Sequence, residues 1–169
     1  MFAYTWQNSN LALKLLFAMV ALNMSSAQAQ TWTDWEQQHA VGKFGQFLVF
    51  QNPDEEGLCF LKQSYADQPT KMELMTKGDG IRILNPFFDG FSDDVRYWVD
   101  EGTKFSLPAS VGTGFTFELS ELSPEALSSG SVLNVEVSPQ GQFRRLQKFP
   151  LTGFFEAYET LIQSPCPSQ

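Results

Sequence analysis

Short apolar runs, many of them alternating with polar residues, recur along most of the chain and are separated by Gly, Pro, Asn and Asp. Such runs are typical of β-strands that bury one face in a sheet. The clearest alternation is "FTFEL" at residues 115–119, where Phe115, Phe117 and Leu119 would share one face. The run "FGQFLVF" at residues 44–50 is apolar on both faces and predicts a buried strand. Further strands are predicted at residues 58–63, 71–76, 81–84, 95–99 and 132–137, the last forming a hairpin with residues 142–151.

Three segments carry helix signals instead. Thr33 and Glu36 have the spacing of a capping box, which predicts a short helix over residues 34–39. A second short helix would follow Ser123 as its N-cap, with Pro124 at the first helical position. Near the end of the chain one helical face collects Phe154, Phe155, Tyr158, Leu161 and Ile162. A helix this short is marginal alone in water, so we expect it to dock on the sheet.

Together these elements predict an all-β fold, an antiparallel β-sandwich or barrel-like sheet with a short inserted helix and a docked C-terminal helix. Residues 44–166 would form a single β-rich domain, because so short a chain is too small for two ordinary domains. Residues 30–43 would be a lead-in segment that contains the first helix, and residues 1–29 a signal peptide.

The signal-peptide prediction rests on an apolar run, Leu15–Leu22, that follows Lys14. Ala27 and Ala29 are the small residues that a signal peptidase requires at positions −3 and −1, so we place cleavage before Gln30. A membrane anchor is the alternative, but the run is well short of the roughly 20 residues that cross a bilayer. We therefore expect a periplasmic or secreted protein with no membrane span after cleavage.

The two cysteines, Cys59 and Cys166, both lie in the part expected to be exported. An even count in an oxidising compartment indicates a disulfide first, and two free thiols or a bond to another chain are the alternatives. Closing a loop of about 100 residues would stabilise the fold by roughly 4–5 kcal/mol in the chain-entropy model. Two cysteines and the single histidine, His39, match no zinc spacing, so we expect no metal and no cofactor.

The charge balance narrows the choice of partner. The chain has 11 basic and 19 acidic residues, and loss of Lys14 with the signal peptide leaves 10 against 19, a net charge of −9. Such a surface repels phosphate backbones, so we expect no nucleic-acid partner. It attracts basic proteins or peptides, which favours a protein partner without identifying it.

The densest acidic stretch, "DGFSDD", supplies the candidate partner surface. Its acids are flanked by aromatic rings, and the residues concerned are Phe87, Phe88, Phe91, Trp98, Asp89, Asp93 and Asp94. If the rings are exposed, they form an apolar patch with an acidic rim that suits protein binding. Burial of most of the rings in the core is the commoner outcome. A calcium site is disfavoured, because the stretch lacks the alternating acids and the later Glu of an EF-hand.

Catalytic residues are scarce in this sequence. A Ser-His-Asp hydrolase needs a histidine as its base, and His39 is the one histidine, in the lead-in segment outside the expected core. A glycosidase-type pair of carboxylates is compatible with 19 acids, but nothing marks one particular pair. We therefore expect a protein that is not an enzyme.

The order of motifs resembles the invasion-associated locus B family of exported bacterial proteins. The matching segments cover nearly the whole mature chain and are residues 44–47 ("FGQF"), 59–60 ("CF"), 97–100 ("YWVD"), 127–130, 150–157 ("PLTGFFEA") and Cys166. Phe47 replaces the usual Trp, and Pro150 stands where a Ser is common. The resemblance implies a β-sandwich, an envelope or extracellular location, and a disulfide between Cys59 and Cys166. It provides no catalytic residues, and the link to host-cell invasion in the family's name need not apply to this chain.

These observations favour an exported, non-enzymatic protein that binds another macromolecule at the envelope or outside the cell. One alternative is an acidic inhibitor of a basic, envelope-directed enzyme such as lysozyme, which the net charge favours. A small hydrolase that uses carboxylates is the less favoured alternative.

Overall fold

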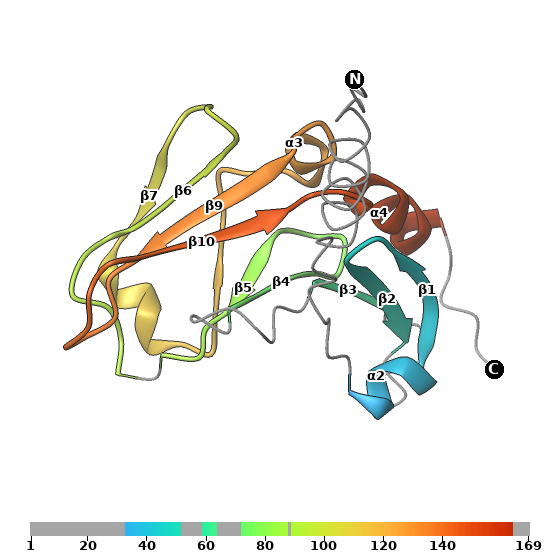
Figure 1. Ribbon diagram of the computed structural model, residues 1–169, viewed down its shortest axis with the longest axis horizontal. Coiled ribbons are helices and arrows are strands. Elements are labelled where there is room, and N and C mark those ends of the chain that lie inside the picture. Colours follow the sequence, from blue (N-terminus) through green and yellow to red (C-terminus); the bar gives the residue numbers. More distant parts are fainter. Residues whose placement is uncertain (1–32, 52–58, 64–71, 88, 164–169) are drawn as a thin grey trace, which may run out of the picture.

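Two antiparallel sheets dominate the computed structural model, which describes residues 33–51, 59–63, 72–87 and 89–163 (Figure 1). The first sheet has the order β1-β2-β3-β4-β5-β8, and the second has the order β10-β9-β6-β7. The predicted signal peptide at residues 1–29 and the cysteine at 166 lie outside the described residues.

The six strands of the first sheet are β1 (Ala40–Phe44), β2 (Phe47–Gln51), β3 (Cys59–Gln63), β4 (Glu73–Thr76), β5 (Arg82–Leu84) and β8 (Thr116–Glu118). The four strands of the second sheet are β6 (Val95–Val99), β7 (Phe105–Leu107), β9 (Val132–Val137) and β10 (Arg145–Pro150). In the first sheet the chain runs as a meander from β1 to β5, and β8 is added at the far edge.

The core lies between the inner faces of the two sheets. The first sheet contributes Val49, Leu61, Leu74 and Ile83, and the second contributes Tyr97, Leu133, Val135 and Phe149; each of these side chains has no exposed surface. Burying one such large side chain stabilises a fold by roughly 1.5–3 kcal/mol. The fold is therefore a β-sandwich, which confirms the predicted fold class.

Three short helices and one 3-10 turn complete the described chain: α2 (Asp34–Gln38), η1 (Ala109–Thr113), α3 (Pro124–Ser128) and α4 (Phe154–Gln163). The capping box predicted for the first helix is present, since Thr33 Oγ1 accepts from the Glu36 backbone N at 3.1 Å and the Thr33 N donates to Glu36 Oε2 at 2.9 Å. Ser123 and Pro124 start α3 as predicted.

The C-terminal helix α4 docks on the first sheet, where it contacts β1, β2 and β3. Its first residue, Phe154, is buried, and its ring packs edge-on against Phe47 with centroids 5.4 Å apart. Gly153, with φ +89°, lies so close to the β1–β2 turn that an added Cβ would be 2.5 Å from the Phe44 carbonyl oxygen. The docked helix that the sequence predicts is thus held at its start by a close backbone contact that requires glycine.

The buried strand predicted within residues 44–50 is present at residues 47–50, but it begins later than expected, because Phe44 ends a separate strand. Gly45, with φ +56°, and Gln46 form the turn of a hairpin between β1 and β2. As a result the sheet begins at Ala40, inside the segment that was predicted to be a lead-in. The sequence of β1, AVGKF, shows no alternation of apolar and polar residues, because this strand lies at the edge of the sheet and is largely exposed.

Two apolar patterns include residues that were expected in the core but are exposed. Phe117 and Leu119 are buried, but Phe115 is 72% exposed just before β8 begins. In α4 the buried stripe includes Ala157, and the predicted stripe members Phe155 and Ile162 are exposed. Periodicity indicates the side of an element on which a residue lies, and it does not indicate how far the neighbouring layer covers that side.

Candidate functional site

Two of the aromatic residues of the predicted partner surface, Phe87 and Phe91, pack on the core. Phe91 is 4% exposed and belongs to the core, and Phe87 is half-buried against it with ring centroids 6.3 Å apart. Trp98 is half-buried on β6, and the Lys104 Nζ lies 4.3 Å from the centroid of its ring. Phe88 lies outside the described residues. Burial of Phe91 agrees with the commoner of the two outcomes considered for these rings.

The three acids of the same stretch all face solvent but do not converge. Asp93 Oδ2 is 3.5 Å from a nitrogen of Arg144, and Asp94 Oδ1 accepts from the Ala109 backbone N at 3.3 Å. Asp89 lines a small cavity of about 210 Å³ together with Phe87. The structure therefore brings Phe87 and Asp89 together and directs Asp93 and Asp94 to other neighbours, so a single partner surface at these seven positions remains a prediction.

One member of the predicted cysteine pair is described. Cys59 is the first residue of β3 and is buried in the core. The helix α4 contacts this strand and ends at Gln163, whereas Cys166 lies outside the described residues. The pairing of Cys59 with Cys166 remains a prediction.

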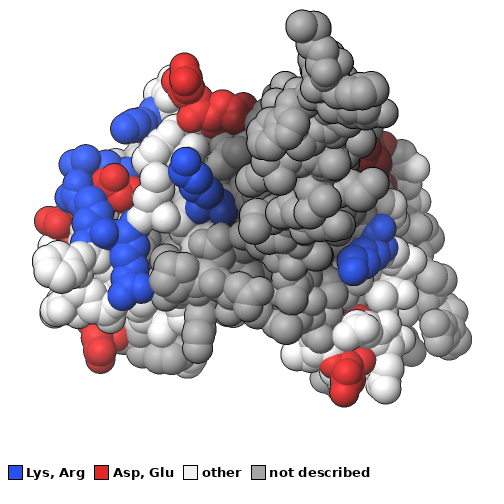
Figure 2. All heavy atoms as spheres, viewed as in Figure 1, with Lys and Arg blue, Asp and Glu red and all other residues white. Residues whose placement is uncertain are grey.

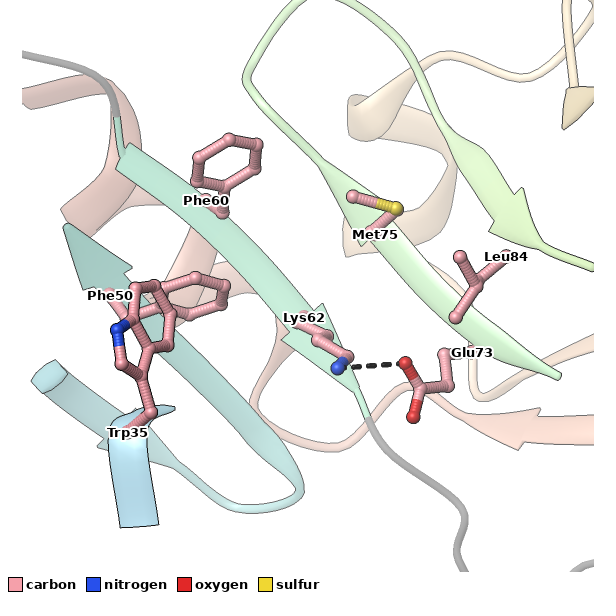
Figure 3. A pocket seen from close by; sticks show the side chains of 7 residues that line it. All are labelled: Trp35, Phe50, Phe60, Lys62, Glu73, Met75 and Leu84. Atoms are coloured by element: carbon pink, nitrogen blue, oxygen red, sulfur yellow. Dashed lines mark ion pairs between the residues drawn. The ribbon is translucent and has the colours of Figure 1, made fainter. Parts of the chain in front are cut away.

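An apolar cavity on the outer face of the first sheet, which we call the outer-sheet hollow, is a candidate binding site (Figure 3). It has a volume of about 280 Å³ and is lined by Trp35 from α2, Phe50 from β2, Phe60 and Lys62 from β3, Glu73 and Met75 from β4, and Leu84 from β5. Pockets with mostly apolar walls and a few polar groups are the usual form of a binding site.

The register of the sheet explains how these residues meet. Side chains alternate between the two faces of a strand, so Leu61 points into the core while Phe60 and Lys62 point outward. The pairs Phe50–Phe60, Lys62–Met75 and Glu73–Leu84 are directly opposite each other on neighbouring strands. Directly opposed side chains contact each other, so the three pairs form one continuous floor.

Three aromatic rings form one wall of the hollow. The rings of Phe50 and Phe60 are stacked with centroids 5.5 Å apart, and Trp35 packs edge-on against Phe50 at 5.8 Å. Trp35 is held in place by α2, whose position depends on the capping box and on the contact of Glu36 with β3. Figure 3 shows the ring of Trp35 standing over the strands at the side of the cavity.

A charged cluster of one lysine and two acids borders the hollow. Lys62 Nζ lies 2.5 Å from Glu36 Oε1 and 2.8 Å from Glu73 Oε2. Burial tends to raise the pKa of Glu36, but hydrogen bonds from Lys62 and Thr33 and the charge of Lys62 lower it below its usual value. Burial likewise tends to lower the pKa of Lys62, and the two carboxylates raise it. With Lys62 and both acids ionised, the cluster carries a net charge of −1.

The geometry of the hollow suits the binding of a side chain. Its apolar wall can accept an aliphatic or aromatic side chain, and the negative border favours a neighbouring cation on the incoming molecule. A carboxylate that acts as a general acid needs a raised pKa, whereas that of Glu36 is lowered. His39 ends α2 beside Trp35, and its Nδ1 is 2.8 Å from the Trp35 carbonyl oxygen. Among the described residues no group of three or more His, Cys, Asp or Glu side chains is arranged to hold a metal ion.

Two strands of the sequence carry signals for this site. In residues 59–63 ("CFLKQ") and 73–76 ("ELMT") the inward residues alternate with Phe60, Lys62, Glu73 and Met75. An outward-facing ring and an outward-facing thioether on neighbouring strands indicate an apolar area that is not needed for the core. Trp35 could not be joined to them, because the placement of α2 across the sheet depends on tertiary contacts.

Comparison with known proteins supports the fold. No family model matches the sequence, and no curated protein matches it closely enough to be counted as a relative. Among solved structures, invasion associated protein b from Bartonella henselae is similar, with a TM-score of 0.54 and 17% sequence identity over 72% of this chain and 95% of the other. No helix in the described part of the chain is long and apolar enough to cross a membrane. The chain is structurally related to an invasion-associated B protein, as its motif order suggested.

Proposed function

We propose that this protein is an exported, non-enzymatic binding protein that holds a protein partner through the outer-sheet hollow. The observation that carries the proposal is the apolar cavity of about 280 Å³, with three aromatic rings in its wall, on the sheet face that points away from the main core and has a small buried cluster of its own at Leu48 and Phe50. Interfaces owe much of their affinity to a few large side chains that fill such pockets. The hollow would receive one side chain of this kind.

The charges around the hollow define the chemistry of the partner. Lys62, Glu36 and Glu73 together leave one negative charge at its border, and the whole chain carries a net charge of −8. A partner that presents an aromatic or aliphatic side chain next to a lysine or arginine would match both features. The similar Bartonella protein is named for invasion, which supports a location at the envelope or outside the cell and contact with a host as part of this proposal.

A blocked hollow tests the proposal directly. Met75 is half-buried and lines the cavity, so Met75→Arg would place a cation and a long side chain in the space meant for the partner. Ile162→Arg, at an exposed position on α4, is the matched control because it makes the same change of charge elsewhere. Proteins from envelope extracts and from host-cell extracts would be captured on each of the three proteins.

We expect a partner that the wild type and Ile162→Arg retain and that Met75→Arg loses. Circular dichroism would confirm that both variants are folded. Capture of the same set of proteins by Met75→Arg would contradict a role for the hollow, and absence of any specific partner in all extracts would contradict the binding function itself.

Inhibition of a basic enzyme is the second candidate, and the net charge of −8 favours it. A lysozyme titrated with the pure protein should then lose activity in a stoichiometric and salt-sensitive manner. Unchanged lysozyme activity at a large excess of the protein would rule out this candidate for that enzyme and would leave the first proposal intact.

A further inference from the structure

The outer face of the second sheet has a different chemical character from that of the first. Arg96 on β6, Lys148 on β10 and Glu136 on β9 are outward residues, because their strand neighbours Tyr97, Val135 and Phe149 are in the core. Figure 2 shows Lys and Arg side chains gathered where Figure 1 places β6, β9 and β10, with acidic side chains among them. We call this area, made up of Arg96, Trp98, Lys104, Glu136, Arg144 and Lys148, the basic sheet face.

The local charge of the basic sheet face is opposite to that of the molecule. Four cations, Arg96, Lys104, Arg144 and Lys148, belong to it, and two acids contact them: Glu136 lies 3.7 Å from Arg96 and 3.2 Å from Arg144, and Asp93 lies 3.5 Å from Arg144. The balance of these four cations and the two acids that contact them is therefore +2, with Asp100 and Glu101 exposed in the loop that carries Lys104, whereas the chain as a whole carries −8. Screening limits exposed charges to roughly 8–10 Å at physiological salt, so an anion at this face responds to the local charge more than to the distant acids.

The contacts fix the cations without removing them from solvent. Glu136 lies between the two arginines, whose side chains remain 51% and 46% exposed. Trp98 on β6, Asn134 on β9 and Lys148 on β10 are directly opposite one another and form a row across three neighbouring strands. Lys104 lies over the ring of Trp98, so the row has one cation at each end, Lys104 and Lys148. Prepositioned charges lose less freedom on binding, which raises affinity for a ligand of matching spacing.

We propose that the basic sheet face binds a linear anionic polysaccharide that carries carboxylate or sulfate groups and runs across the strands. Strands are about 4.8 Å apart, so Trp98 on β6, which has Lys104 over its ring, and Lys148 on β10 are separated by about 10 Å across the sheet. A row of separated, exposed cations matches an extended polymer with repeated anionic groups. This inference is independent of the proposed function, because it concerns the other sheet and another class of ligand.

Other polyanions fit this face less well. Insertion into a lipid surface requires a group of protruding apolar side chains, and the described residues on or next to these strands offer two, Leu146 on β10 and Phe143, which is 93% exposed in the β9–β10 turn beside Arg144. Binding of single-stranded nucleic acid depends on bases stacked on open aromatic rings, and the ring of Trp98 is covered by Lys104. Anionic vesicles and DNA therefore serve as comparison ligands in the test.

Heparin is the probe for the test, with neutral dextran as its control. The double variant Lys104→Ala/Lys148→Ala removes the two ends of the row. Its matched control is Lys43→Ala/Lys77→Ala. These two exposed lysines lie in β1 and just after β4, away from the basic sheet face, and the two double variants have the same net charge. The control also removes a comparable cation–ring contact, because Lys77 lies 4.7 Å from the Phe60 ring centroid.

We expect the wild type to bind heparin at low salt despite its negative net charge and not to bind dextran. Each lysine near a polyanionic surface contributes about fivefold, so Lys104→Ala/Lys148→Ala should bind roughly 25-fold more weakly, with the control close to wild type. The slope of log affinity against log salt concentration should also decrease by about one to two, as fewer counterions are released. Lys104→Arg/Lys148→Arg should restore binding.

Four outcomes would overturn the inference. They are failure of the wild type to bind heparin, equal losses in the two alanine variants, no recovery with the arginine variant, and tighter binding to single-stranded DNA or to vesicles that contain phosphatidylglycerol. None of these outcomes would change which proteins the chain captures. The proposed function is therefore tested separately, by the capture experiment with Met75→Arg.

Discussion

Replacement of Lys62 by Met should destabilise the protein by an amount that depends strongly on pH. The lysine contacts Glu36 and Glu73, whose side chains are only 8% and 19% exposed. Breaking a fully buried ion pair costs about 3–5 kcal/mol, and an exposed pair contributes about 0.2–1 kcal/mol. Because this cluster is mostly but not fully buried, we expect a loss of about 2–3 kcal/mol at pH 7. That loss corresponds to a fall in Tm of roughly 6–9 °C for a domain of this size.

The pH dependence follows from the direction of the pKa of Glu36. In the wild type this pKa is below its usual value of 4.5, so the ionised acid stabilises the fold at neutral pH, and this contribution is lost as pH falls below 4.5. In Lys62→Met the burial of Glu36 is no longer opposed by a cation, so its pKa should rise above the usual value. The variant then gains stability relative to the wild type as pH falls, and the two curves should approach each other as pH falls toward and below 4.5.

Urea unfolding of both proteins between pH 4 and pH 8 measures this difference. Arg82→Met is the matched control on the same sheet, because Arg82 pairs with Asp79 at 2.7 Å and with Glu118 at 3.4 Å and both acids are well exposed. The control should lose less than about 1 kcal/mol. A loss in Lys62→Met that is equally small, or one that does not change with pH, would refute the conclusion that the lysine compensates buried carboxylates.

Three further changes test the contacts that hold the fold. Gly153→Ala should lower the free energy of unfolding by about 3 kcal/mol or more, because the new Cβ would lie 2.5 Å from the Phe44 carbonyl oxygen. Gly141→Ala, with open space around it, is the control and should cost about 1 kcal/mol. Equal losses in urea unfolding would contradict the close contact. Asn85→Ala should cost about 2–3 kcal/mol, because this buried side chain bonds four backbone groups, and a loss under 1 kcal/mol would show that water replaces them. Thr33→Ala should cost about 1 kcal/mol through loss of the helix cap, and an unchanged unfolding midpoint would contradict this.

The inner faces of the strands could be predicted from the sequence because one physical requirement determines them. Val95 and Tyr97 were placed on one face by alternation alone, and both are completely buried. Met72, Leu74 and Thr76 were placed together in the same way and are likewise buried. Period-two burial is local information, since each strand must bury one face whatever its neighbours are.

The edges of the sheets could not be predicted in this way. The strand β1 (Ala40–Phe44) contains Gly42 and Lys43 and buries little, so its pairing with β2 is determined by the turn at Gly45 and not by apolar alternation. The prediction that Phe115 shares a buried face with Phe117 was wrong for a related reason. Phe115 lies just before β8, at a point where the second layer leaves it 72% exposed. Coverage is a property of the assembled sandwich.

The candidate site escaped prediction because it combines residues whose proximity depends on register. Trp35 and Leu84 lie about half a domain apart in sequence, and they meet only because β2 to β5 form a meander under α2. A shift of one residue in the pairing of β3 with β4 would turn Lys62 or Glu73 inward and remove the cluster. Acids and aromatic rings are close together in sequence at residues 87–98, and this local pattern gave the predicted partner surface. Contacts across strands, which form the hollow, leave no such local pattern.

The two outer faces should act independently, because the core separates them and their charges differ in sign. The hollow on the first sheet has a border of −1, and the basic sheet face has a balance of +2. The charges point outward into solvent from opposite faces, so they are further apart than the roughly 10 Å between the sheets, and screening over roughly 8–10 Å leaves little direct electrostatic coupling between them. Met75→Arg should therefore leave heparin binding unchanged, and Lys104→Ala/Lys148→Ala should leave partner capture unchanged. If either variant weakened both kinds of binding in folded protein, the two ligands would share one surface, and the division of the sandwich into two separate binding faces would be wrong.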